Sequence, residues 1–173
     1  MKMPTLYFLI LLELLHCHSA QAKTDTMRLF FDGDVIATPC RLVSSNQVEV
    51  NFGSKSVSQV NESGRLRGDD IVIKLAQCPV VTTSITAQLM GEPDSIHLDF
   101  YKNQGSAKNI AISIYDPLSL RYLDNGAAVT TSVLESAADR TAEFKWEAWV
   151  ETPQQNATEG TINGVVTVNL TYQ

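Results

Sequence analysis

Histidine and cysteine are scarce in this sequence, which has three of each among its 173 residues. Two of the histidines lie close to the N-terminus, so His97 is the one histidine in the rest of the chain. Metal sites draw on His, Cys and carboxylate ligands at suitable spacing, and this chain offers too few of the first two. Motifs of the GxSxG, HExxH and Walker A kinds are absent as well. These absences argue against an enzyme, and we expect no catalytic residue, no metal and no cofactor.

Positive charge is also in short supply, because 13 lysines and arginines stand against 19 aspartates and glutamates, for a formal net charge of −6. A protein that follows the phosphates of a nucleic acid needs the opposite balance, so we expect no nucleic-acid partner. The chain is 44% hydrophobic and 18% charged, which excludes intrinsic disorder. Its length suits a single domain with a hydrophobic core.

The longest apolar run lies at the N-terminus, over residues 6–15, and no second stretch of membrane length follows. Lys2 gives it a short basic start, and Ala20–Ala22 forms a small-x-small cleavage site, as in a secretory signal peptide. The run is too short for a helix that crosses a bilayer, which needs about 20 apolar residues. An N-terminal core helix is the alternative, and Pro4 argues against it. We therefore expect residues 1–22 to be a signal peptide and the mature chain to be exported.

Two cysteines, Cys40 and Cys78, remain once such a signal peptide is removed. In an exported chain a lone pair of cysteines is typical of one disulfide. A metal site would need more ligands than these two cysteines and His97 provide. The sequence therefore predicts a Cys40–Cys78 disulfide.

Apolar and polar residues alternate along several segments that are bounded by Gly, Pro, Asn, Asp or Ser, a pattern typical of half-buried strands. The segments are 27–35, 48–52, 71–75, 85–89, 110–114, 144–150 and 166–172. Their number and spacing predict an all-β sandwich or barrel. Val133–Asp139 is the one stretch that could form a short helical turn. No linker or internal repeat divides the chain, so we expect one domain.

The segment before Cys40 is long for the first strand of a self-contained sandwich. One of its faces, defined by the period of two in a strand, carries a row of apolar residues and a glycine. These residues are Met27, Leu29, Phe31, Gly33 and Val35. The segment is either an ordinary first strand or an arm that pairs with the open sheet edge of another chain.

The last predicted strand runs almost to the end of the chain, with Gln173 after it. Its apolar face carries Val166, Val168, Leu170 and Tyr172. A terminal strand with no hairpin after it can lie at a sheet edge, where unpaired backbone groups invite a partner strand.

Taken in order, these segments resemble the type 1 fimbrial family of chaperone–usher pilins. The resemblance covers the whole mature chain, and its motifs are Phe31–Cys40, Val48–Gly53, Ile71–Pro79, Ile110–Ala127 and Gly160–Gln173. Tyr101–Gly105 and Cys78–Pro79 are most similar to the minor tip-adaptor subunits of the family. The chain is therefore identified as a pilin subunit of this pathway.

The resemblance implies an incomplete immunoglobulin-like sandwich over residues 36–173 that lacks its final strand, preceded by a donor-strand arm over residues 23–35. In the family, a periplasmic chaperone fills the resulting groove first, and the arm of the next subunit then replaces it by donor-strand complementation. The donor residues would be those of the apolar face of the arm, which are Met27, Leu29, Phe31, Gly33 and Val35. The strand that the chaperone recognises would contain Gly160, Val166, Val168, Leu170 and Tyr172.

The resemblance also implies the partners and the location of the protein. We expect a periplasmic chaperone, an outer-membrane usher and neighbouring subunits as partners, with export through the periplasm to a cell-surface fimbria that contributes to adhesion. Contact with a host receptor is indirect or unknown. A single-domain carbohydrate-binding fimbrial adhesin is one alternative function. A free-standing exported enzyme that uses Asp69, Asp70 or His97 is another.

Trp149 lies on the polar face of its predicted strand, out of register with Trp146. Either a nearby loop covers it or it contacts a neighbouring subunit, because aromatic residues are enriched at protein interfaces.

Overall fold

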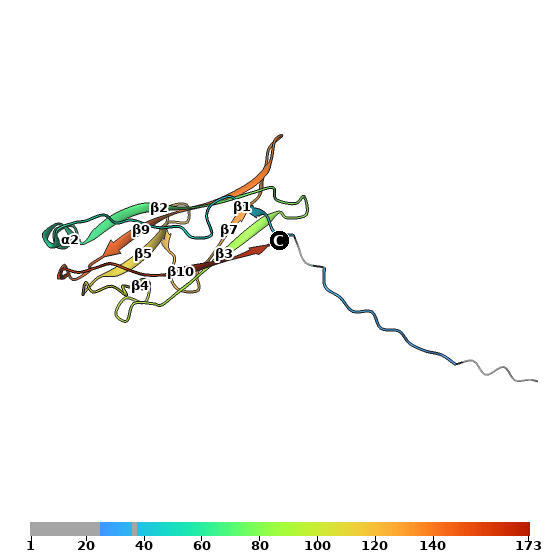
Figure 1. Ribbon diagram of the computed structural model, residues 1–173, viewed down its shortest axis with the longest axis horizontal. Coiled ribbons are helices and arrows are strands. Elements are labelled where there is room, and N and C mark those ends of the chain that lie inside the picture. The colour runs from blue at the N-terminus through green and yellow to red at the C-terminus, as the bar shows by residue number, and fades with distance from the viewer. Residues whose placement is uncertain (1–24, 36–37) are drawn as a thin grey trace, which may run out of the picture. The chain divides into compact units, whose positions relative to one another are not determined.

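The computed structural model describes residues 25–35 and 38–173 (Figure 1). It divides into two units, of which the first ends at Val35 and the second runs from residue 36 to Gln173. The second unit, here called the sandwich unit, contains all helices and strands of the described chain. The signal peptide expected over residues 1–22 lies outside the described residues.

The larger sheet forms one layer of the sandwich unit (Figure 1). Its strands follow the order β1-β2-β9-β5-β4, with β6 paired to β5 and β8 paired to β9. All of these pairs are antiparallel. The strands are β1 (Arg41–Leu42), β2 (Arg65–Ala76), β4 (Tyr101–Lys102), β5 (Ala111–Asp116), β6 (Arg121–Tyr122), β8 (Leu134–Glu135) and β9 (Arg140–Glu151).

The smaller sheet has three antiparallel strands in the order β10-β3-β7. They are β3 (Ser84–Gly91), β7 (Ala128–Ser132) and β10 (Val166–Tyr172). β10 pairs with β3 along its whole length, from Val166 opposite Gly91 to Tyr172 opposite Ile85. Among the described residues β3 is its one partner strand, so β10 is an edge strand.

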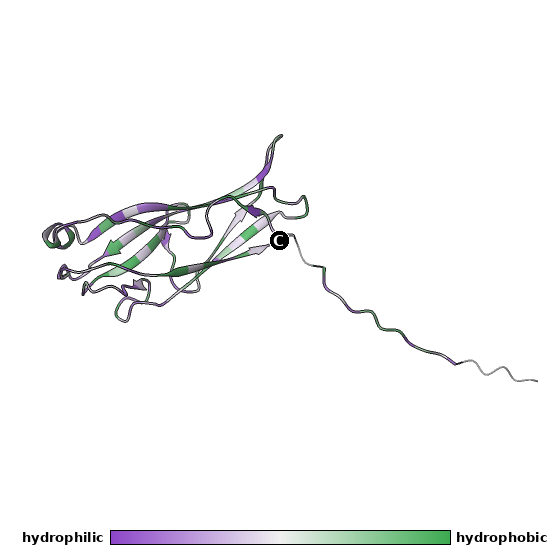
Figure 2. Ribbon diagram, in the orientation of Figure 1, coloured by the Kyte–Doolittle hydropathy of each residue, from purple (hydrophilic) through white to green (hydrophobic). Residues whose placement is uncertain are grey.

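The all-β prediction is confirmed, because five of the predicted segments form the long strands. They are 71–75 in β2, 85–89 in β3, 110–114 in β5 except for Ile110, which precedes the strand, 144–150 in β9 and 166–172 in β10. Side chains along β9 alternate between buried and exposed, as in a strand with one face on the core. Figure 2 shows the same alternation as bands of hydrophobic and hydrophilic residues along β2.

One helix in the described residues, α2 (Val57–Ser63), was not predicted from the sequence. A capping box begins it, because the backbone N–H of Gln59 donates to Ser56 Oγ while that of Ser56 donates to Gln59 Oε1. Gly64 ends the helix at a φ of 72°, in the left-handed region. Among the described residues, 25–35 and 38–173, no helix is long and apolar enough to cross a membrane.

The helical turn predicted over 133–139 is wrong. Leu134 and Glu135 form β8, which pairs with the start of β9, and the backbone N–H of Ser136 donates to the carbonyl of Asp139. Pairing of β8 with β9 satisfies backbone N–H and C=O groups of both strands. A single isolated helical turn could not satisfy the groups of both strands.

The main core lies between the two sheets and takes side chains from both. The larger sheet contributes Ile73, Leu75, Ile114, Phe144 and Trp146, and the smaller sheet contributes Ile85, Ala87 and Leu89. A second buried cluster joins α2 to the far end of the larger sheet through Val60, Ala107, Ile110, Val150 and Ala157.

The predicted disulfide is present, between Cys40 at the start of the sandwich unit and Cys78 after β2. Both cysteines are buried in the main core. The bond closes a loop with a sequence separation of 38 residues.

Replacing both cysteines by serine is expected to lower the free energy of unfolding by about 4 kcal/mol, by loss of the restraint on the unfolded chain. Urea unfolding of the mature chain and its Cys40→Ser/Cys78→Ser variant measures the difference. Thiol titration of the unfolded, unreduced wild-type protein should find no free thiol, and two reactive thiols per chain would contradict the bond.

Candidate strand-acceptor groove

A hydrophobic groove of about 860 Å³ runs beside β10 in the sandwich unit. One wall is β10 with the residues that lead into it, 162–165, and the other wall is the segment 45–52. The floor is built from inward-facing side chains of the larger sheet. These side chains are Ile71 and Ile73 of β2, Tyr101 of β4, Ile112 and Ile114 of β5, and Trp146 and Ala148 of β9.

The two faces of β10 differ in burial. The apolar side chains Val166, Val168, Leu170 and Tyr172 are half-buried against the core, whereas Thr167, Asn169 and Thr171 between them are exposed. On the neighbouring strand β3, the core-facing Ile85, Ala87 and Leu89 are completely buried. Inward-facing residues of β10 therefore lack cover on the side away from β3.

Of the residues expected in the strand that the chaperone recognises, Val166, Val168 and Leu170 line the groove. Tyr172 does not line the groove, although it packs against the core, and burial raises the pKa of its hydroxyl. The strand therefore presents a shorter apolar wall than its sequence alone indicates.

The inclusion of Gly160 in the terminal strand is wrong. This glycine lies before β10 and outside the groove lining, with a φ of 148°. A Cβ at this position would collide with the backbone of Ala107, so close packing of two loops explains the glycine. Gly164, nearer the strand, does line the groove, and a Cβ there would meet the Ile112 side chain at 2.7 Å.

The strand predicted over 48–52 is wrong as well, because this segment has no strand structure. Val48 is 44% exposed, and the segment is tied to the larger sheet near its end, where the backbone N–H of Asp69 donates to the carbonyl of Asn51. The alternating pattern marks a wall that borders the groove, with no partner strand on its groove side among the described residues.

The predicted arm face lies in the first unit and is exposed in the described residues. Met27, Leu29 and Phe31 are 81%, 69% and 91% exposed, and residues 25–35 form neither helix nor strand. Apart from Gly33 and its two chain neighbours, no described residue has a heavy atom within 4 Å of the place that a Cβ of Gly33 would occupy. Within the described part of the first unit, no residue covers the apolar face of the arm or accounts for its glycine.

The acidic residues that an exported enzyme would use have structural roles instead. Asp70 forms ion pairs with Arg67 and Lys145, and the hydrogen bond from Arg67 lowers the pKa of this carboxyl. Asp69 accepts a hydrogen bond from the backbone N–H of Asn51. The described residues hold no cluster of three or more His, Cys, Asp or Glu side chains that could bind a metal ion.

For Trp149, of the two alternatives of cover by a loop and contact with a neighbouring subunit, the structure shows cover within the chain, by an arginine of the adjacent strand. The guanidinium carbon of Arg65, on the adjacent β2, lies 3.7 Å from the centre of the indole ring. The indole N–H donates to Glu147 on the same strand. A cation over the ring and a carboxylate at its edge leave this outward-facing tryptophan half-buried.

Glu151 at the end of β9 is a buried carboxyl that the sequence analysis missed. It is 6% exposed and accepts a 2.8 Å hydrogen bond from the hydroxyl of Ser113 on β5. Burial raises its pKa, and the Ser113 hydrogen bond and the charge of Arg65 act in the opposite direction. Alternation along β9 places it on the outward face, so no sequence signal marked it as buried.

Replacing Glu151 by glutamine is expected to weaken the pH dependence of stability. With its pKa raised by folding, this carboxyl holds its proton more tightly in the folded chain, so stability falls as the pH rises through the folded-state pKa. Glutamine removes that loss, and urea unfolding between about pH 5 and pH 8 should show a flatter profile. The matched control is Glu143→Gln, an exposed glutamate of the same strand, which should keep the wild-type profile. An unchanged profile for Glu151→Gln would mean that the buried carboxyl ionises without a folding penalty.

The fold and the groove together define an immunoglobulin-like sandwich that lacks one strand. The family model described as "Fimbrial protein" matches residues 29–173. The chain is 32% identical over 164 residues to Protein FimG of Escherichia coli (strain K12), an alignment that covers 94% of this chain and 95% of FimG. The chain therefore belongs to the fimbrial protein family, and it is a structural subunit of a fimbria, not an enzyme.

Solved structures show the same fold. A chain of a chaperone–usher pilus, from a study of rod uncoiling, has a TM-score of 0.65 and 21% identity, and the match covers 88% of this chain and 99% of that one. The P pilus rod subunit PapA has a TM-score of 0.62 and 20% identity, with 79% of this chain and all of PapA (100%) covered. At this level of identity the likeness establishes the fold of the chain and nothing further.

Proposed function

We propose that the groove beside β10 accepts a β-strand from a neighbouring fimbrial subunit, and that residues 23–35 are the strand that this chain donates to another subunit. The observation that carries the proposal is the presence, in one chain, of an edge strand beside an apolar groove and of an arm with an exposed apolar face. The groove of one chain lacks a strand, and the arm of a second copy or of a relative would supply it.

The groove has the form that a single added strand requires. β10 offers unpaired backbone groups along one edge, while the floor offers apolar side chains from β2, β5 and β9. Backbone pairing gives affinity and register in this mode of recognition, and side-chain pockets give specificity. The apolar stretch of the arm, 27–35, equals in length the groove-lining stretch 162–170, so one arm can fill one groove.

The arm supplies enough apolar surface to hold two subunits together. Burying Met27, Leu29 and Phe31 would contribute up to about 4–9 kcal/mol by area, before the cost of ordering the arm. Gly33 is then explained, because a position without a Cβ suits the close approach of a partner's backbone or of a bulky groove side chain.

A groove of this kind must be covered before assembly, because an exposed apolar face with an open sheet edge promotes aggregation. We infer that a periplasmic chaperone covers it by lending a strand, and that an outer-membrane usher is where the donor arm of the next subunit replaces that strand. The same proposal takes the chain through the periplasm to a cell-surface fimbria. The resemblance of Tyr101–Gly105 to tip-adaptor subunits, together with the similarity to FimG, favours a minor subunit near the fibre tip.

Expression of the mature chain in the periplasm, with and without the chaperone of its own fimbrial system, tests the proposal. With the chaperone we expect a one-to-one complex, and without it little soluble protein. A synthetic arm peptide of a following subunit should then release the chaperone. A stable, monodisperse monomer that needs neither chaperone nor peptide would contradict the proposal, because it would show that the groove needs no added strand.

A further inference from the structure

We infer that the loop between β2 and β3, with Val80 and Val81 at its tip, is a docking surface for the subunit that receives the arm of this chain. The inference rests on the proposed function, because it takes the arm to be inserted in a neighbour. It adds a second contact between the two subunits, outside the groove, which would restrain the angle between their domains.

The two valines are unusually exposed for their type. Val80 is 79% exposed and Val81 is 72% exposed. Isolated exposed apolar residues are ordinary on protein surfaces. Two adjacent ones at the tip of a turn, where polar residues predominate, are better explained by a partner.

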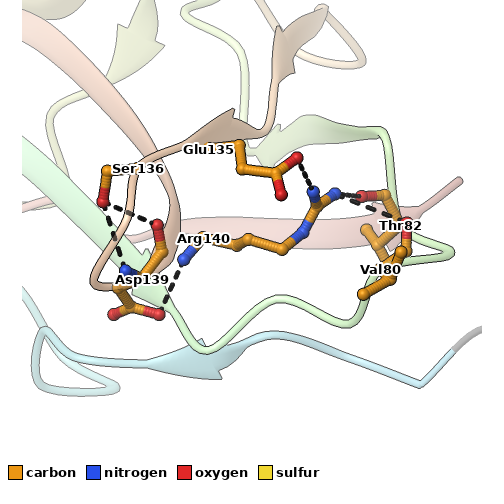
Figure 3. A network of polar contacts seen from close by, with 6 residues as sticks. All are labelled: Val80, Thr82, Glu135, Ser136, Asp139 and Arg140. Carbon is orange, nitrogen blue, oxygen red and sulfur yellow. Dashed lines mark hydrogen bonds and ion pairs between the residues drawn. The ribbon is translucent and has the colours of Figure 1, made fainter.

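Hydrogen bonds and a buried threonine hold the loop in its conformation. The backbone N–H of Thr82 donates to the carbonyl of Pro79, and Thr82 itself is completely buried. Arg140 donates from its guanidinium to the carbonyl of Thr82 at 2.9 Å and to that of Val80 at 3.4 Å (Figure 3). A surface that is already ordered loses little conformational entropy on docking.

The guanidinium that fixes the loop is itself fixed. Arg140 forms an ion pair with Glu135 of β8 at 2.6 Å, and its side chain is 16% exposed (Figure 3). The adjoining turn is closed by Ser136 and Asp139, whose side chains hydrogen-bond to the turn backbone. The valine tip therefore projects from a framework that spans β8, β9 and the loop.

The loop lies beside the root of the arm, which determines the occupant of the surface. The hydroxyl of Thr82 donates to the carbonyl of Thr38, and the disulfide ties Cys40 to Cys78 at the base of the loop. Two residues, 36 and 37, separate Val35 from Thr38, so Val35 lies at most about 11 Å from Thr38 along an extended chain. A subunit that holds the arm up to Val35 is therefore within reach of the valine tip.

Site-specific photo-crosslinking in assembled fimbriae tests the inference. Three variants of the full chain carry p-benzoylphenylalanine in place of one residue, as Val80→p-benzoylphenylalanine, Phe30→p-benzoylphenylalanine and Ile96→p-benzoylphenylalanine. Position 30 lies on the outward face of the arm, so in an inserted strand it would not fill the groove, but its cross-strand neighbours on the receiving subunit would lie about 4.5–5.5 Å away, within reach of a crosslink that reports insertion. Position 96 is the matched control, because Ile96 is 66% exposed in the loop at the opposite end of β3.

We expect ultraviolet light to join positions 30 and 80 to the same neighbouring subunit, identified by mass spectrometry of the adduct, and position 96 to give no adduct with that subunit. An adduct from position 30 without one from position 80 would overturn the docking surface and leave donor-strand insertion standing. Adducts of that subunit from positions 80 and 96 in equal yield would overturn it too. Absence of an adduct from position 30 would contradict arm insertion itself, and the inference would fall with it.

Discussion

Replacing Val168 and Leu170 together by aspartate is expected to abolish recovery of the chain as a complex with its periplasmic chaperone. Both side chains line the groove on the inward face of β10. Covering such a side chain with a partner contributes about 1.5–3 kcal/mol, and the variant would instead bury two carboxylates against an apolar strand. Co-purification from periplasm, with the chaperone carrying the affinity tag, measures the recovery.

The outward face of the same strand provides the matched control. Asn169→Asp with Thr171→Asp adds the same charge to exposed neighbours of Val168 and Leu170, so we expect recovery close to that of the wild type. If both double variants lost recovery of the complex equally, the cause of the loss would be added charge on β10 and not disruption of the groove. Undiminished recovery of the Val168→Asp/Leu170→Asp variant would mean that the chaperone binds elsewhere.

The sequence was sufficient to predict the strands because their alternation is set by a core that lies within the chain. Leu75, Leu89 and Phe144 are buried in the main core and do not line the groove, so their burial does not depend on a partner. The same holds for the disulfide, whose pairing followed from export and from the count of cysteines. In these places the local pattern and the folded contacts agree.

The prediction failed where the chain lacks a strand of its own. The segment 48–52 alternates as a strand does, yet it forms a groove wall, because no strand among the described residues pairs with its groove side. In the proposed function, that strand comes from another subunit. The pattern at 48–52 reports which side chains face inward, and it carries no information on whether a partner strand is present.

Two smaller failures have local causes. The helix α2 could have been found from Ser56 and Gln59, which form a capping box, followed by Gly64 at its end. Its few apolar residues gave no helical period, so the caps were the one available signal. Gly160 was assigned to the terminal strand by its place in a family motif, whereas its φ and its contact with Ala107 belong to the loop before the strand.

The arm offers a sharper test than the groove, because Phe30 and Phe31 are adjacent, chemically identical and similarly exposed, at 89% and 91%. In an inserted strand, successive side chains point to opposite faces, so Phe31 shares the inward face with Met27 and Leu29 while Phe30 points outward. Replacing Phe31 by aspartate is expected to stop incorporation of the chain into fimbriae, since it removes a large apolar contact and places a charge in an apolar groove.

Replacing Phe30 by aspartate is expected to leave incorporation close to the wild-type level, because the same charge would then face solvent. Immunodetection of the chain in sheared fimbriae measures incorporation, and co-purification with the chaperone shows that each variant folds with its own groove intact. The Phe31→Asp variant should keep its chaperone and lose only its place in the fibre. Equal incorporation of the two variants would show that the arm does not insert in the proposed register, and incorporation of a chain that lacks residues 23–31 would show that it is not a donor strand.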